Sequence, residues 1–288
     1  MIVPGLKHTL CVLREAPPGL YLDGVELGEI LLPGKYIPEG TVPGDRLEVF
    51  VHHDSEDRLV ATTQTPHALL GQVAGFEVVG VRPGIGAFLD WGLDKDLLCP
   101  LREQTKNPQV GDWVVAMVVL DAVSGRLMAS MRLQRHLHKK PPEYTEAQSV
   151  DLVIVEETDL GYKTVINNAH WGLLYKSETP TTLVPGDELL GFIRTVRPDG
   201  KIDVGLDAPG YQRVAPLADQ ILAAVRASEG VLAFDDKSDP EAIREKFGAS
   251  KKAFKQALGK LLRQRRIEFV KGGIKLTPTR IPASETAG

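Results

Sequence analysis

Short apolar runs, separated by glycine, proline and polar residues, fill the first two thirds of the chain. In the run RLEVFV, Leu47, Val49 and Val51 occupy every second position, which is the period of a half-buried strand. Similar runs recur at 73–81 and 113–120 with no helical period between them. Strands without helices predict antiparallel β domains, and closure into small barrels is expected because an isolated hairpin is only marginally stable in water.

One spacing occurs three times along these strands. A glycine stands 12 residues before a leucine and 25 residues before a Gly-Asp pair, and a basic residue follows the Asp after 13 or 14 positions. These residues are Gly19, Leu31, Gly44-Asp45 and Arg58, then Gly86, Leu98, Gly111-Asp112 and Arg126, then Gly161, Leu173, Gly186-Asp187 and Lys201. Three copies of one module are therefore predicted, at residues 1–63, 66–137 and 150–209. Residues 138–149, which include Pro141-Pro142, are predicted to be a linker.

The hydrophobic period becomes helical from about Ala215. Leu217, Ile221 and Val225 are spaced to share one face of a first helix. The segments SDPEAIREKFG and ASKKAFKQALGKLLRQRR each begin with a capping residue and predict two further helices. The segment IEFVKGGIKLTP then predicts two strands around a Lys-Gly-Gly turn. Helix, helix, helix and hairpin predict a winged-helix domain at residues 213–280.

Composition and charge add one asymmetry to this picture. The 288 residues are 43% hydrophobic and 25% charged, as in ordinary globular proteins. No stretch has the roughly 20 apolar residues of a membrane span, and the start lacks a long apolar signal region, so we expect a cytoplasmic protein without membrane contact. Residues 1–212 contain 19 Lys and Arg against 29 Asp and Glu, whereas residues 213–280 contain 15 against 8. The basic C-terminal domain is expected to provide most of the electrostatic attraction for an anionic partner.

Motifs for catalysis or metal binding are weak. The pairs His136 with His138 and His52 with His53 lack the neighbouring ligands of a metal set. The segment RPGIGAF does not have the GxGxxG spacing of a dinucleotide site, and no activated nucleophile is indicated. Cys11 and Cys99 are expected to be buried free thiols. We therefore expect a protein that is not an enzyme and has no cofactor and no metal.

The second module resembles the S1-type RNA-binding OB fold in its GAFLDW turn, its Gly-Asp pair, and an Asp followed within a few residues by Arg. The resemblance implies a barrel whose exposed aromatic ring stacks on bases while cations meet phosphates. Transferred by motif position, this implies an RNA-binding role for a short set of residues. The set is Tyr21 and Arg58 in the first copy, Phe88, Asp121 and Arg126 in the second, and Tyr175 and Lys201 in the third, where Lys163 stands in place of the aromatic.

The predicted third helix of the C-terminal domain has a basic face. At ~100° per residue, Phe254, Leu258 and Leu261 share one side, and the basic residues lie opposite them. Such a face beside a basic wing is typical of elements that contact nucleic-acid phosphates. The basic candidates are Lys251, Lys252, Lys255, Arg263, Arg266 and Lys271.

The whole chain resembles the conserved virulence factor B family of bacteria, most specifically in GLDKDLL and SKKAFK. The resemblance implies a mainly β, multidomain fold of three S1-type OB barrels followed by a winged helix. It also implies RNA binding, with single-stranded RNA as the expected partner, and post-transcriptional regulation of gene expression. A DNA-binding transcription regulator and a protein-interaction scaffold are the alternatives, with duplex DNA or ribosome-associated proteins as partners. The oligomeric state is left open by the sequence.

Overall fold

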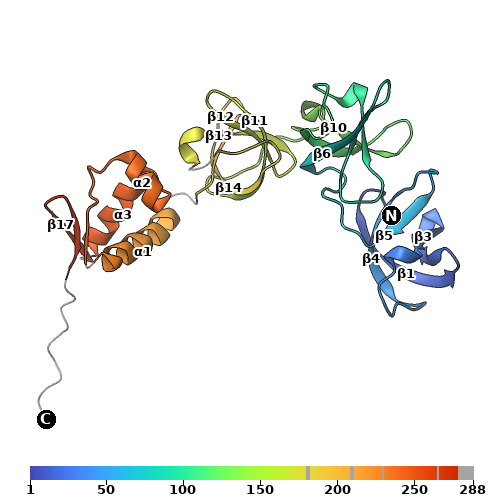
Figure 1. Cartoon of the computed structure of the whole chain (residues 1–288), viewed down its shortest axis with the longest axis horizontal. Coiled ribbons are helices and arrows are strands. Elements are labelled where there is room, and N and C mark those ends of the chain that lie inside the picture. The colour runs from blue at the N-terminus through green and yellow to red at the C-terminus, as the bar shows by residue number, and fades with distance from the viewer. Residues whose placement is uncertain (180–181, 208–210, 229, 265, 278–288) are drawn as a thin grey trace, which may run out of the picture.

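A computed structural model describes residues 1–179, 182–207, 211–228, 230–264 and 266–277, with the side chains of 211–216 excepted. Residues 208–209 of the predicted third module and 278–280 of the predicted winged-helix domain lie outside the described residues. Within the described residues, the chain forms three β-barrel domains followed by a helical domain with a small sheet. The second barrel, the third barrel and the helical domain follow one another along the long axis, and the first barrel lies beneath the second in this view (Figure 1). The predicted fold class is confirmed. No helix in these ranges is long and apolar enough to cross a bilayer.

The three barrels share one strand order when it is read around the barrel, whichever strand the list begins with. Barrel 1 closes in the order β1-β2-β3-β5-β4 and barrel 3 in the order β11-β12-β13-β15-β14, while barrel 2 is a curled sheet in the order β10-β9-β6-β7-β8. In barrel 1 the strands are β1 (Lys7–Ala16), β2 (Gly19–Asp23), β3 (Glu29–Pro33), β4 (Arg46–His53) and β5 (Leu59–Thr62). In barrel 2 they are β6 (Val73–Arg82), β7 (Gly86–Leu89), β8 (Leu97–Pro100), β9 (Trp113–Leu120) and β10 (Leu127–Ser130). In barrel 3 they are β11 (Ser149–Glu157), β12 (Gly161–Ile166), β13 (His170–Tyr175), β14 (Glu188–Val196) and β15 (Ile202–Gly205).

The repeated glycine has a steric reason that the spacing alone does not reveal. Gly86 begins β7, where a Cβ atom would lie 2.2 Å from the carbonyl oxygen of Cys99 on the neighbouring strand. The corresponding distances are 2.1 Å at Gly19, from Leu32 O, and 2.1 Å at Gly161, from Leu174 O. Only glycine allows the two backbones to approach so closely.

The repeated Gly-Asp pair is a turn that ends in a hydrogen bond. Gly111 has φ +89°, which favours glycine, and the Asp112 carboxylate accepts a hydrogen bond from the backbone N–H of Gln109 at 2.8 Å. Asp45 and Asp187 accept equivalent bonds, each at 2.8 Å, from residues three positions earlier. The turn therefore fixes where the long fourth strand of every barrel begins.

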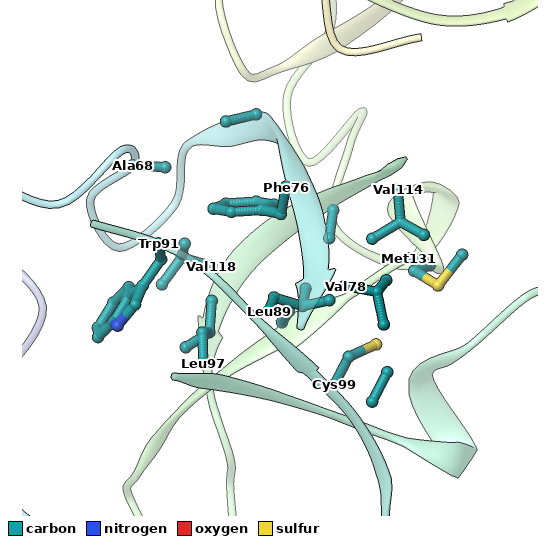
Figure 2. Packing of buried hydrophobic residues seen from close by; sticks show 14 of the residues in the cluster. Ala68, Phe76, Val78, Leu89, Trp91, Leu97, Cys99, Val114, Val118 and Met131 are labelled. Atoms are coloured by element: carbon teal, nitrogen blue, oxygen red, sulfur yellow. The ribbon is translucent and has the colours of Figure 1, made fainter. Parts of the chain in front are cut away.

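The core of barrel 2 contains one of the two cysteines (Figure 2). Cys99 is fully buried beside Val78, Leu89 and Met131, and burial raises the pKa of its thiol to about 12. Cys11 is only half-buried on β1, so the expectation that both thiols are buried is wrong for Cys11. Its strand alternates in burial, and Cys11 lies between the buried Leu10 and Val12.

Thiol labelling should separate these two environments. The thiolate is the form of cysteine that reacts with iodoacetamide. Because Cys99 is buried and its thiol pKa is raised to about 12, iodoacetamide at pH 8 should modify Cys11 and leave Cys99 unmodified in the folded protein. Mass spectrometry of tryptic peptides would measure the two extents of modification. Both thiols should react in 6 M guanidinium, and equal rates in native buffer would contradict the described barrel core.

Barrels 2 and 3 are joined by a shared apolar cluster. Val73, Met117, Leu133 and Leu137 of barrel 2 and its exit turn pack with Val153 and Val165 of barrel 3. The backbone N–H of Val73 also donates to Asn168 Oδ1 at 2.7 Å. At the same junction, Gly75 lies so close to Gly186 that an added Cβ atom would stand 2.7 Å from the Gly186 Cα.

The connecting segment 138–149 runs along barrel 3. The Tyr144 side chain packs against the barrel 3 core, and its hydroxyl lies 2.9 Å from His170 Nδ1. His138 Nε2 accepts a hydrogen bond from the backbone N–H of Trp171 at 3.1 Å. The segment is therefore packed against barrel 3.

The C-terminal domain contains α1 (Tyr211–Ala227), β16 (Val231–Leu232), α2 (Pro240–Phe247), α3 (Lys251–Arg263), β17 (Ile267–Val270) and β18 (Gly273–Leu276). Helix α2 begins at Asp239, whose carboxylate accepts from the N–H groups of Glu241 and Ala242, and it ends at Gly248 with φ +61°. Ser250 then caps α3 by accepting from the backbone N–H of Ala253. These caps satisfy otherwise unpaired helix ends and orient α3 across the domain core.

Candidate nucleic-acid interface

An open groove of about 900 Å³ lies on one face of barrel 2 and extends to barrel 1. Phe88, Asp121 and Arg126, which the S1-type resemblance singles out in this barrel, all line it. Its other walls come from the β8 region, including Pro100, and from His52 and His53 at the end of β4. The structure therefore brings the three residues together, and it adds a wall from barrel 1 that the sequence did not indicate.

Phe88 occupies a supported position in this groove. It pairs across β6 and β7 with Gly80, next to an irregularity between Val78 and Gly80. Gly80 has no side chain, and a Cβ atom added there would lie 3.7 Å from Phe88 Cβ. The guanidinium of Arg82 lies 5.2 Å from the centroid of the Phe88 ring. A partly exposed ring that lines an open groove beside a cation can stack on a base.

The two polar residues of the motif have different partners. Arg126 Nε lies 2.5 Å from Oδ1 of Asp57 in barrel 1, while Asp121 Oδ1 lies 3.0 Å from Arg102 Nη2 and its Oδ2 accepts from Ser124 Oγ at 2.9 Å. The Asp121 and Arg126 side chains therefore form ion pairs with other residues and not with each other. Asp121 stabilises the β9–β10 turn, and the hydrogen bond from Ser124 is the main cause that lowers its carboxyl pKa.

In barrel 1 the candidate residues are covered by their own neighbours. The guanidinium of Arg14 lies 3.9 Å from the centroid of the Tyr21 ring and is itself paired with Glu29. Arg58 pairs with Asp54 at 2.7 Å and with Glu56 at 2.9 Å. Neither Tyr21 nor Arg58 lines the groove of barrel 2. The Tyr21 ring is in contact with Arg14, and the Arg58 guanidinium is paired with two carboxylates.

In barrel 3 the tyrosine belongs to a polar cluster. Arg197 Nη2 donates to the Tyr175 hydroxyl at 2.6 Å, and the same guanidinium forms a two-atom pair with Asp203, which is buried. Lys201 pairs with Asp199 at 3.0 Å. The hydrogen bond with Asp203 is the main cause that raises the pKa of Arg197, so this cluster is a charged network fixed within the barrel.

The basic side chains of the winged helix are arranged differently. Helix α3 buries Ala253, Phe254, Ala257, Leu258 and Leu261 against the domain core, and the opposite face is solvent-exposed. In the part of the chain that the structure describes, no carboxylate lies within ion-pair distance of the exposed basic residues. These residues are Lys252, Lys255, Arg263, Arg266 and Lys271. Lys251 is partly buried and donates to the carbonyl of Lys237 at 3.2 Å.

The wing carries an aromatic residue that the sequence interpretation missed. Phe269 on β17 is 47% exposed, beside the exposed Arg266 and Lys271 in the sequence. Exposed aromatic rings are the stacking surfaces of proteins that bind single strands. In the segment IEFVKGG, Ile267 and Phe269 are two positions apart, and apolar residues at that spacing predict one buried face. In the structure Ile267 is buried and Phe269 is not.

Two family models match this chain. Residues 4–64 match the S1 domain, and residues 219–276 match the CvfB-like winged helix domain. The chain is similar in sequence to conserved virulence factor B. The resemblance inferred from the sequence is thus confirmed. The matched domains are of nucleic-acid-binding types rather than enzyme types.

The similarity to these relatives extends over most of the chain. Conserved virulence factor B of Staphylococcus epidermidis is 26% identical over 246 residues, which cover 81% of this chain and 80% of the relative. Uncharacterized protein YitL of Bacillus subtilis is 29% identical over 282 residues, covering 92% and 90%. A crystal structure of a multidomain protein with nucleic acid binding domains from Streptococcus pneumoniae aligns over 95% of this chain and 98% of its own, with 22% identity and a TM-score of 0.41.

Proposed function

We propose that this protein binds single-stranded RNA and acts as a post-transcriptional regulator of gene expression. The observation that carries the proposal is the set of exposed basic side chains on α3 and the wing that have no carboxylate partner among the described residues. In barrels 1 and 2, by contrast, Arg58 and Arg126 are paired with carboxylates. Cations without partners attract phosphates without first losing an ion pair.

The charge pattern of α3 also departs from the pattern that favours an isolated helix. Its first turn has no acidic residue and contains Lys251 and Lys252, although the positive end of the helix dipole favours acids there. Such a local conflict is expected at functional sites. A phosphate at this end would interact favourably with both the dipole and the lysines.

Single-stranded RNA is favoured over a duplex by the groove of barrel 2. Phe88 can stack only on a base whose face is open, and bases in a duplex are already stacked on their neighbours. The groove of about 900 Å³ therefore suits an unpaired segment. The S1-domain match in barrel 1 points to the same ligand class.

Binding to an RNA oligonucleotide should show the salt dependence of phosphate contacts. For single strands the slope of log K against log salt is about −0.7 for each phosphate contact, so engagement of the basic residues without carboxylate partners should give a slope of about −3.5. Fluorescence anisotropy with a labelled 20-nucleotide RNA at several KCl concentrations would measure it. Affinity that does not change with salt would contradict the proposal.

A DNA-binding transcription regulator is the second candidate, because a basic α3 beside a basic wing also fits a duplex groove. Unlabelled duplex DNA and single-stranded RNA of equal length should be compared as competitors in the same assay. RNA is expected to compete more effectively. Stronger competition by the duplex would favour the transcription regulator, and no binding of either nucleic acid at physiological salt would favour a protein-interaction scaffold.

A further inference from the structure

An acidic loop of barrel 1 lies at the groove of barrel 2. The loop joins β4 to β5 and reads Asp54-Ser55-Glu56-Asp57-Arg58, with three acids and one base. Ser55 lines the groove itself. Asp57 Oδ1 lies 2.5 Å from Arg126 Nε. Lys95 Nζ of barrel 2 donates to two backbone carbonyls at the start of the loop, those of His53 at 3.0 Å and Asp54 at 2.8 Å.

Oxygen atoms of barrel 1 therefore occupy the positions that phosphate oxygens would take on these two cations of barrel 2. Carboxylates and phosphates bind a guanidinium with the same geometry, since both present oxygen acceptors to its N–H groups. The hydrogen bond from Arg126 is the main cause that lowers the pKa of Asp57, so this carboxylate is negatively charged at neutral pH. Arg126 cannot bind an RNA phosphate through the same N–H group while this bond is in place.

We propose that a single-stranded RNA segment binds in the groove by exchange, with a phosphate displacing the Asp57 carboxylate from Arg126 and a base stacking on Phe88. The acidic loop is then a competitor built into the chain, which lowers the affinity of the barrel 2 groove. The inference rests on the proposed RNA-binding function and adds to it the binding site and the carboxylate that is displaced. It involves no covalent step.

The loop is built so that the exchange can occur without unfolding it. Asp54 Oδ1 accepts from the N–H groups of Glu56 and Arg58, each at 2.9 Å, and these bonds hold the turn independently of barrel 2. The Arg126 and Asp57 side chains, by contrast, are 54% and 49% exposed, and exposed ion pairs contribute little to stability. A phosphate can therefore replace Asp57 while the Asp54 turn remains.

The decisive variant is Asp57→Asn. Asp57 has φ +69°, and Asn tolerates this backbone conformation as well as Asp does, so the loop should keep its shape. We expect Asp57→Asn to raise the affinity for a labelled 20-nucleotide RNA about fivefold, since it removes both the competing carboxylate and its repulsion of phosphate. Glu56→Gln is the matched control, because Glu56 lies in the same loop but pairs with Arg58 of its own barrel. The control should change the affinity less than twofold.

A second comparison tests whether Arg126 mediates the effect. In an Arg126→Gln background, Asp57→Asn should no longer raise the affinity, because the cation for which phosphate and carboxylate compete is absent. Thermal unfolding would verify that each variant is folded. An equal gain in Asp57→Asn and Glu56→Gln, no gain in either, or a gain that persists without Arg126 would overturn the exchange while leaving RNA binding intact. Failure of the wild-type protein to bind RNA would instead overturn the proposed function.

Discussion

Replacing Lys252, Lys255 and Arg263 together with glutamate is expected to weaken RNA binding at least about 100-fold at 0.1 M salt. Each phosphate contact with a single strand contributes a slope of about −0.7 in log K against log salt, so three lost contacts correspond to about two powers of ten at that concentration. The new carboxylates would add repulsion. The same variant should flatten the salt slope by about 2, which anisotropy titrations at several KCl concentrations would measure.

The fold of the winged helix should survive this change. All three side chains are exposed, and none belongs to the buried face of α3 formed by Phe254 and its neighbours. A first-turn glutamate at position 252 would even favour the helix dipole. Circular dichroism should therefore show native helix content in the variant.

A control with the same change in net charge separates location from total charge. Lys106, Lys139 and Lys140 are exposed in or after barrel 2 and lie outside the groove residues and the winged helix. Their joint replacement by glutamate should reduce affinity far less than the α3 variant. Equal losses would mean that RNA responds only to the overall charge of the protein, and α3 would then lose its assigned role.

The sequence predicted the fold well because the signals that set it are local. A glycine that must approach a neighbouring backbone, as Gly86 does, and a Gly-Asp turn closed by its own carboxylate, as at Asp112, leave a fixed spacing in the chain. The helix caps at Asp239 and Ser250 are equally local. Each of these constraints acts within one barrel or one turn, so a single sequence is sufficient to reveal it.

The sequence could not predict the partners of the candidate site residues, because these partners lie on other strands and other domains. Asp121 and Arg126 lie in one turn, as their spacing indicates, yet the Arg126 guanidinium is bound by Asp57, 69 positions away in barrel 1. The ring of Tyr21 is covered by Arg14 from the adjacent strand. Motif position identifies which residue types are present, whereas availability for a ligand depends on contacts that form only on folding.

The junction between barrels 2 and 3 was equally hidden, since its apolar residues look like ordinary strand residues. Val73 and Met117 are buried although they lie outside the cluster that fills barrel 2. Their burial depends on the approach of barrel 3. One face of an antiparallel strand in a small barrel normally contacts water. The segment VVAMVV at 114–119 is apolar on both faces, and this pattern was the sequence signal for a covered outer face.

Gly75→Ala is expected to disrupt this junction, with a loss of about 1–3 kcal/mol of the stability contributed by packing between the barrels. The added Cβ would lie 2.7 Å from the Gly186 Cα, and this atom belongs to a turn backbone that cannot rotate away as a flexible side chain could. The two barrels must therefore separate or β6 must shift. Gly80→Ala is the matched control on the same strand, because its Cβ would meet Phe88 at 3.7 Å, an ordinary contact.

Separation of the barrels would expose the apolar cluster and make the connecting segment 138–149 more accessible. Limited proteolysis should therefore cleave Gly75→Ala between barrels 2 and 3 at least several times faster than the wild type, and Gly80→Ala at the wild-type rate. The radius of gyration from small-angle scattering should increase in the same variant. Unchanged cleavage and scattering in Gly75→Ala would mean that the barrels do not form this close backbone contact in solution, and each barrel would then have to bind its RNA segment as an independent unit.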